Sequence, residues 1–185
     1  MCPMTAAPLD LEWSLLGFLR QEPTHGYELH RRLSRSRGLG LVWHLKQSQL
    51  YALLAKLEEQ GYVDHTLEPQ ASRPPRKVYD LTEAGRQALL EWVQAPVEHG
   101  REFRQEFLAK LYFARREGEE VVHRLLAGQR AVCRRWLEEQ NEAEALREER
   151  PYEWLVFEFR TGQIRAMLEW LETCETALLP SEYEE

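Results

Sequence analysis

Cysteine is scarce in this 185-residue sequence, and the sequence contains no long apolar run. Cys2, Cys133 and Cys174 are too few and too scattered for a disulfide framework, and none belongs to a Cys-x-x-Cys pair. No segment approaches the roughly 20 uncharged apolar residues of a membrane-spanning helix. Residues 1–10 lack the basic segment and apolar core of a signal peptide. We therefore expect a soluble, reduced protein of the cytoplasm.

The sequence also lacks the patterns of common catalytic and metal sites. It has no glycine-rich phosphate loop, no His-x-x-x-His pair and no Gly-x-Ser-x-Gly elbow. His25 with His30, and His123 with Cys133, have no third ligand at a suitable spacing. We therefore expect no enzymatic activity, no metal and no cofactor.

The chain does have a high apolar fraction and an uneven charge. Apolar residues make up 43% of the sequence, which is enough to fill the cores of one or two domains. Residues 1–95 hold 11 basic and 11 acidic side chains, so the whole net charge of −7 lies in the second half. Residues 20–77 carry 10 basic groups against 6 acidic ones. Such a local excess is compatible with nucleic-acid binding by an acidic protein, because salt confines each charge to about 10 Å.

The first half of the chain predicts three helices, a hairpin and a fourth helix. Leucines recur at helical spacing, glycines and prolines separate the segments, and Thr24 and Thr82 are expected to cap helices. We expect helices over residues 9–20, 24–37, 47–60 and 82–93, strands over 62–67 and 77–81, and a turn over 68–76. This order is typical of a winged helix-turn-helix domain.

The third predicted helix has the pattern of a helix that reads DNA. Leu50, Leu53, Leu54 and Leu57 form one apolar stripe, so the opposite side should face solvent. The residues at the centre of that side are small, which lets the helix lie deep in a major groove. Residues at the helix start make most base contacts in such motifs, and glutamine pairs well with adenine. The predicted base-reading residues are Gln47, Ser48 and Gln49.

The predicted hairpin tip is basic and stiff. Its sequence, RPPRK at residues 73–77, places three cations beside two prolines of fixed φ. A stiff basic loop suits a DNA backbone or a minor groove. We therefore predict that the hairpin tip contacts phosphates, together with one tyrosine and one lysine of the third helix. The predicted phosphate contacts are Tyr51, Lys56, Arg73, Arg76 and Lys77.

These segments resemble the PadR family of transcriptional regulators. The resemblance implies a dimeric repressor that a small aromatic or hydrophobic effector releases from DNA. It covers residues 9–95 well, and the helical remainder resembles the family's C-terminal dimerisation domain less specifically. The motifs that carry it are LGFL at 16–19, HGYEL at 25–29, QLY at 49–51 with Leu54, LEEQGYV at 57–63, RPPRKVY at 73–79, LTEAG at 81–85 and Trp92.

The second half predicts long helices over residues 101–116, 119–150 and from Pro151 onward. Two helices of about 30 residues would be about 45 Å long, more than a domain of this size can cover, so a partner chain is expected to cover their apolar stripes. Gln129 within the stripe either sets the register or is a tolerated polar residue. The predicted dimer interface comprises Val122, Leu125, Gln129, Val132, Trp136, Phe157, Ile164, Leu168 and Leu171.

Together these patterns predict a mainly α protein with a winged helix-turn-helix domain over residues 1–95 and an antiparallel long-helix dimerisation domain over residues 96–185. The expected winged domain has three helices, a two-stranded wing and a fourth helix. The expected function is that of a homodimeric, effector-released repressor on an inverted-repeat operator. The alternative is a helical adaptor that binds protein and not DNA.

Two further residue choices stay open at this point. His25 either caps the second helix or bonds a phosphate, while Tyr27 beside it is expected to face inward. The tryptophans sit at core positions, although an aromatic ligand cage is the alternative.

Overall fold

The computed structural model describes residues 11–35, 45–70, 73–139 and 150–179. The chain divides into two compact units. The first unit runs to Val93 and also takes in Arg104–Phe113, and the second contains Gln94–Phe103 and the residues from Ala114 onward. Each unit is described by itself.

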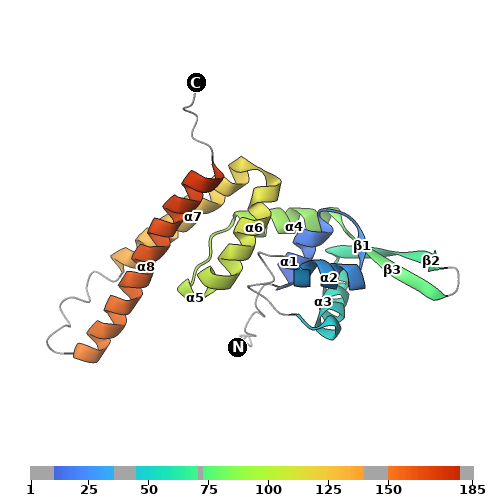
Figure 1. The fold of residues 1–185 in the computed structure, drawn as a ribbon, viewed down its shortest axis with the longest axis horizontal. Helices are drawn as coiled ribbons and strands as arrows, with labels where there is room; N and C mark the ends of the chain where they lie inside the picture. The colour runs from blue at the N-terminus through green and yellow to red at the C-terminus, as the bar shows by residue number, and fades with distance from the viewer. Residues whose placement is uncertain (1–10, 36–44, 71–72, 140–149, 180–185) are drawn as a thin grey trace, which may run out of the picture. The chain divides into compact units, whose positions relative to one another are not determined.

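The first unit is a winged helix (Figure 1). Its hairpin, formed by β2 and β3, extends away from the helical part of the unit (Figure 1). The elements are α1 (Leu11–Leu19), β1 (Thr24–His25), α2 (Gly26–Arg35), α3 (Gln47–Glu59), β2 (Val63–Gln70), β3 (Arg73–Leu81) and α4 (Glu83–Gln94). The predicted order of helices and hairpin is thereby confirmed.

The sheet is larger than the sequence predicts. Its order is β1-β3-β2 with antiparallel pairs, because Thr24 and His25 pair with Tyr79 and Val78 instead of starting a helix. The two hairpin strands also extend into the segment predicted as a turn, where β2 ends at Gln70 and β3 begins at Arg73. β3 accommodates its two prolines there because β1 pairs only farther along β3 and the β2 register is irregular near residues 68–70. Proline has no N–H to donate, so it is tolerated at such open or irregular ladder positions.

Leucines from the three helices form the core of the first unit. The stripe of α3 is buried as predicted at Leu50, Leu54 and Leu57, each at most 1% exposed, whereas Leu53 is only half-buried. Burying such side chains is the main term that holds small domains together. The α1 and α2 leucines that complete this core are Leu15, Leu16, Leu19, Leu29 and Leu33.

Thr82 caps α4, as predicted. The backbone N–H of Gly85 donates to the Thr82 hydroxyl at 3.0 Å, and that hydroxyl donates to the carbonyl of Gly61 at 2.7 Å. The N–H of Thr82 donates to the carbonyl of Tyr62 at 3.1 Å. These bonds attach the start of α4 to the turn that follows α3, so they fix where the wing begins.

The helix predicted over residues 101–116 is interrupted. It consists of α5 (Gly100–Glu102), a π-helical turn over Phe103–Phe107 and α6 (Leu108–Glu117). A π turn adds a residue to the helical repeat and therefore rotates the buried face. Phe107 is fully buried.

The second unit is built on α7 (Glu119–Glu138) and α8 (Pro151–Leu178), which pack side by side (Figure 1). α7 ends earlier than predicted, and the rest of that predicted helix, residues 140–149, lies outside the described residues. Among the helices that the structure describes, none is long and apolar enough to cross a membrane.

The expectation that a partner chain must cover the apolar stripes is wrong for six of the nine predicted interface residues. Packing within the single chain already buries Val122, Leu125, Gln129, Val132, Ile164 and Leu171. Trp136, Phe157 and Leu168 stay half-buried.

Gln129 also has a role that neither interpretation of the sequence foresaw. Its side-chain oxygen accepts from the N–H of Val97 at 2.7 Å, and its amide donates to the Val97 carbonyl at 3.3 Å. The side chain therefore pairs a buried backbone segment of its own chain.

Candidate nucleic-acid interface

α3 presents a polar face with small residues at its centre to solvent. Because its leucines point into the core, the opposite side of the helix is exposed. Alanines at the middle of this side leave room for a close approach to a groove. The exposed residues of α3 include Gln47, Ser48, Gln49, Tyr51, Ala52, Ala55 and Lys56. This exposure agrees with the predicted DNA-facing side, while the DNA contacts themselves stay a prediction.

The structure separates Gln49 from the two residues before it. The Gln49 side-chain oxygen accepts from the backbone N–H of Lys46 at 3.1 Å, which closes the first turn of α3. Within the described part of the chain, Gln47 and Ser48 show no such side-chain bond. They are therefore available to a ligand without disrupting the helix start.

The predicted phosphate-binding cations all have acidic partners where the structure describes them. Lys56 Nζ lies 2.6 Å from Glu12 Oε1, Arg76 Nε lies 2.6 Å from Glu68 Oε2, and Lys77 Nζ lies 3.3 Å from Glu58 Oε2. The Arg73 side chain lies outside the described part. Exposed ion pairs of this kind contribute little stability and exchange readily. DNA phosphates can therefore replace the carboxylates as partners.

Glu58 connects α3 to the wing. Its carboxylate contacts His65 of β2 as well as Lys77 of β3, and Lys77 also lies 5.9 Å from the centre of the Tyr79 ring. Burial opposes the charged form, but hydrogen bonds from Lys77 and His65 outweigh it and hold the pKa of Glu58 below its usual value. The hydrogen bond from Arg76 lowers the pKa of Glu68 in the same way. Both carboxylates are therefore charged at neutral pH, and Glu58 fixes the wing against the helix.

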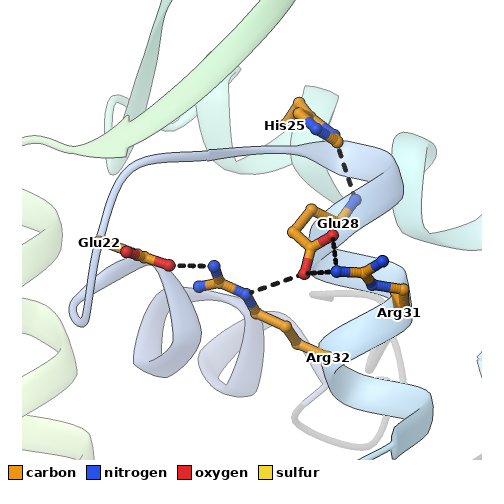
Figure 2. Close-up of polar contacts among 5 residues, drawn as sticks. All are labelled: Glu22, His25, Glu28, Arg31 and Arg32. Atoms are coloured by element: carbon orange, nitrogen blue, oxygen red, sulfur yellow. Dashed lines mark hydrogen bonds and ion pairs between the residues drawn. The ribbon is translucent and has the colours of Figure 1, made fainter.

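Figure 2 shows a second polar cluster at the start of α2. The Glu28 carboxylate pairs with Arg31 at 2.8 Å and with Arg32 at 3.4 Å, and Arg32 also pairs with Glu22. Burial opposes ionisation of Glu28, but the two arginines outweigh it and lower its pKa. The charges of Arg31 and Arg32 are thereby paired within the chain.

His25 has the capping role that the sequence allowed as one of two. Its Nδ1 atom accepts from the backbone N–H of Glu28 at 3.2 Å (Figure 2). The prediction for Tyr27 is wrong, because this side chain is 58% exposed. Leu29 and Leu33 occupy the inward positions of α2, so Tyr27 points away from them.

Sequence reasoning missed the acidic partners of the cations. Glu12 is 44 residues from Lys56 and Glu58 is 19 residues from Lys77, so no local pattern relates them. Glu28 with Arg31 and Arg32 is the exception, since helical spacing of three and four residues predicts such pairs. Among the residues described, no group of three or more His, Cys, Asp or Glu side chains could hold a metal ion.

Comparison with known proteins supports the resemblance seen in the sequence. Residues 15–91 match the transcriptional regulator PadR-like family, and residues 103–178 match the family described as virulence activator alpha C-term. The negative transcriptional regulator PadR of Bacillus subtilis is 31% identical over 103 residues, 56% of each chain. A probable transcriptional regulator of Mycobacterium tuberculosis is 34% identical over 89 residues, which are 48% of this chain and 46% of that protein.

The chain thus spans about half the length of these two relatives. A solved structure of Bacillus subtilis PadR in complex with operator DNA is similar at 24% identity with a TM-score of 0.46, covering 91% of this chain and 99% of that one. Both curated relatives are described as regulators of transcription. Residues 15–91, the part of the chain that matches the transcriptional regulator PadR-like family, contain all the predicted DNA contacts.

Proposed function

We propose that this chain is a sequence-specific DNA-binding repressor that acts as a homodimer and is released by a small effector. The observation that carries the proposal is the exposed face of α3, which has small residues at its centre and a first turn closed by the Gln49 side chain. A basic wing accompanies this helix in the region that matches the PadR-like family. In the relative from Bacillus subtilis the described function is negative regulation, and the solved complex contains operator DNA. An adaptor that binds protein does not require cations on both a helix and a wing.

In this proposal the start of α3 reads bases and the wing holds the backbone. Gln47 and Ser48 contact base edges in the major groove, because they are exposed and have no side-chain partner in the described structure. Gln49 contributes mainly by holding the first turn. Lys56, Arg76 and the neighbouring Lys77 exchange their carboxylate partners for phosphates.

Gln47→Ala tests the reading role. We expect the variant to lose discrimination at one base pair of each half-site, by about 1–3 kcal/mol if the contact is bidentate. The measurement is a titration against the duplex that the wild-type chain selects from a random pool, changed one base pair at a time. Gln87→Ala is the matched control, because Gln87 is an exposed glutamine on α4. Unchanged discrimination by Gln47→Ala would transfer the reading role to Ser48 or Gln49.

The homodimer is supported by an apolar face on α8. Four large apolar side chains near its start are strongly exposed, and a cluster of this kind marks an interaction surface. They are Tyr152 (74% exposed), Leu155 (57%), Val156 (41%) and Phe159 (66%). We propose that a second copy covers this face and the half-buried residues Trp136, Phe157 and Leu168. Two-fold symmetry would then present two α3 helices to an inverted repeat.

Phe159→Glu tests the dimer. A charge buried at the proposed interface costs several kcal/mol, so the dimer dissociation constant should rise about 100-fold or more. Sedimentation velocity at micromolar concentration should show a dimer for the wild type and a monomer for the variant. Leu67→Glu is the control, because Leu67 is also a strongly exposed apolar residue but lies on β2 in the first unit. A monomeric wild type that still protects a symmetric DNA site would refute the dimer.

A hollow within the second unit supports the effector. It measures about 550 Å³ and is lined by residues 98–101, the end of α7 and the middle of α8. Trp136, Ile164 and Met167 supply apolar surface. The charged lining residues are Arg101, Arg135 and Arg160 together with Glu98 and Glu139, and Arg135 pairs with Glu98. We propose this hollow as the effector site.

A further inference from the structure

A second hollow lies in the first unit, between α2, α3 and the wing. It measures about 570 Å³. Its lining comes from β1, α2, α3, β2 and β3, so the hollow depends on the packing of the sheet against the helices. The lining residues are His25, Gly26, Tyr27, Tyr51, Gln70, Arg76, Lys77 and Tyr79.

The side chains around this hollow are rich in hydrogen-bond donors. Three tyrosine hydroxyls, one amide, one guanidinium and one ammonium line it, and no carboxylate is among its described lining residues. The nearest acids known to pair with its cations, Glu58 and Glu68, lie outside the lining. A site with many donors and positive charge selects an oxyanion.

His25 adds a donor whose tautomer follows from its cap. Because Nδ1 accepts from the N–H of Glu28, the proton of the neutral ring resides on Nε2 (Figure 2). The Tyr27 ring stacks on this imidazole, with centres 6.4 Å apart and planes at 23°. Both rings are therefore held in place at the start of α2.

Gly26 allows Tyr51 of α3 to reach the same place. A Cβ atom at residue 26 would lie 2.6 Å from Cε1 of the Tyr51 ring, closer than real Cβ contacts. The glycine thus lets the ring lie directly against the start of α2. Tyr51 is 42% exposed and Tyr27 58%, so both hydroxyls are accessible from solvent.

We propose that this hollow seats one phosphate group of the duplex DNA backbone, with Tyr27 as a contact beyond those predicted from the sequence and with His25 contacting the phosphate through Nε2 while Nδ1 caps α2. The inference rests on the proposed DNA-binding function. The hydroxyls of Tyr27 and Tyr51 and the His25 Nε2–H donate to the phosphate oxygens, and Arg76 and Lys77 supply the opposite charge. The strand would then pass between α2 and the wing while α3 enters the groove, so the hollow fixes the register of α3 on DNA.

Tyr27→Phe in the full chain tests the site with a mixed-sequence duplex as probe. The variant loses a hydrogen bond to a charged group but no charge, so affinity should fall about 10-fold while the salt dependence stays unchanged. His25→Asn should weaken binding similarly, because asparagine retains a helix cap but lacks the Nε2–H donor. Tyr62→Phe is the matched control and should bind like the wild type, because the Tyr62 ring packs 6.0 Å from that of Trp13 and does not line the hollow.

A methylphosphonate scan identifies the phosphate. In this scan, one phosphate per strand is made neutral, at each position in turn, in the duplex that the wild type selects. At the position of the proposed phosphate, the neutral group should weaken DNA binding by the wild type but should not weaken binding by Tyr27→Phe any further. If the wild type binds DNA and Tyr27→Phe and His25→Asn bind it as tightly as the wild type does, the inference is wrong and the proposed function stands. If the wild type binds no duplex even at low salt, both are wrong. Saturable binding of inorganic phosphate to the hollow without any effect of Tyr27→Phe on DNA would assign the site to a free anion and overturn the inference.

Discussion

Replacing Arg76 and Lys77 together with alanine is expected to weaken binding to all duplex sequences alike. Each cation is proposed to neutralise one phosphate, so the slope of log K against log salt should fall by about two per chain. The loss is electrostatic and carries no sequence information, because the backbone is the same at every site. Fluorescence anisotropy titrations at several salt concentrations measure both the affinity and the slope.

The control for this double variant removes the same charge elsewhere. Arg124→Ala with Arg134→Ala deletes two exposed cations of α7, outside the predicted DNA contacts and the proposed effector site. It should leave the slope unchanged. An unchanged slope for the wing variant as well would remove Arg76 and Lys77 from the backbone role.

Gly85→Ala is expected to produce the largest loss of stability among glycine-to-alanine changes at the glycines that the structure describes. A Cβ atom at residue 85 would lie 2.0 Å from the carbonyl oxygen of Tyr62, which is backbone and already accepts from Thr82. The turn at Tyr62 or α4 must therefore shift and strain the cap that joins them. Overpacking of this severity costs roughly 3 kcal/mol, a large part of a typical domain stability. Thermal or urea denaturation measures the change.

Gly162→Ala provides the contrast. Residue 162 lies within α8, and a Cβ atom there would meet nothing within 4 Å. Alanine is the better helix former, so this variant should be as stable as the wild type or more so, by up to about 1 kcal/mol. Equal stability of Gly85→Ala and the wild type would contradict the close contact between α4 and Tyr62.

The predictions that held are those that rest on local periodicity and local chemistry. The leucine spacing of α3 correctly predicted its buried stripe and its exposed face, and the Thr82 cap followed from residue type alone. The helix, helix, helix, hairpin, helix order needed no long-range information. It identified the domain before any contact was known.

The features that the sequence could not show depend on distant pairings. Thr24 becomes a strand residue because Tyr79 offers it a ladder position. The Gln129 side chain is hydrogen-bonded to Val97, 32 residues away, a role that neither of the two interpretations of the sequence included. The apolar stripe of α7 was predicted to pack against a partner chain. Periodicity shows that one face of a helix is buried, but it does not show which chain buries it.

The candidate site shows the same division. Exposure of the α3 face was predictable, but the pairing of Lys56 with Glu12 and of Lys77 with Glu58 was not. The exposure of Tyr27 could not be predicted either, since the pattern of one turn of a short helix does not determine which side of the helix faces the core. These missed features all affect how strongly the predicted contacts can bind, and none changes which face of the molecule is proposed to meet DNA.

Selection of duplexes from a random pool by the wild-type chain tests the central claim most directly. The account predicts enrichment of an inverted repeat whose half-sites are about 10 or about 20 base pairs apart, because two α3 helices must enter major grooves on one side of the duplex. The purified full chain should then protect both half-sites of that duplex in a footprint. A pool that shows no enriched sequence, at salt concentrations low enough for non-specific binding to be measurable, would contradict the claim that this chain reads DNA.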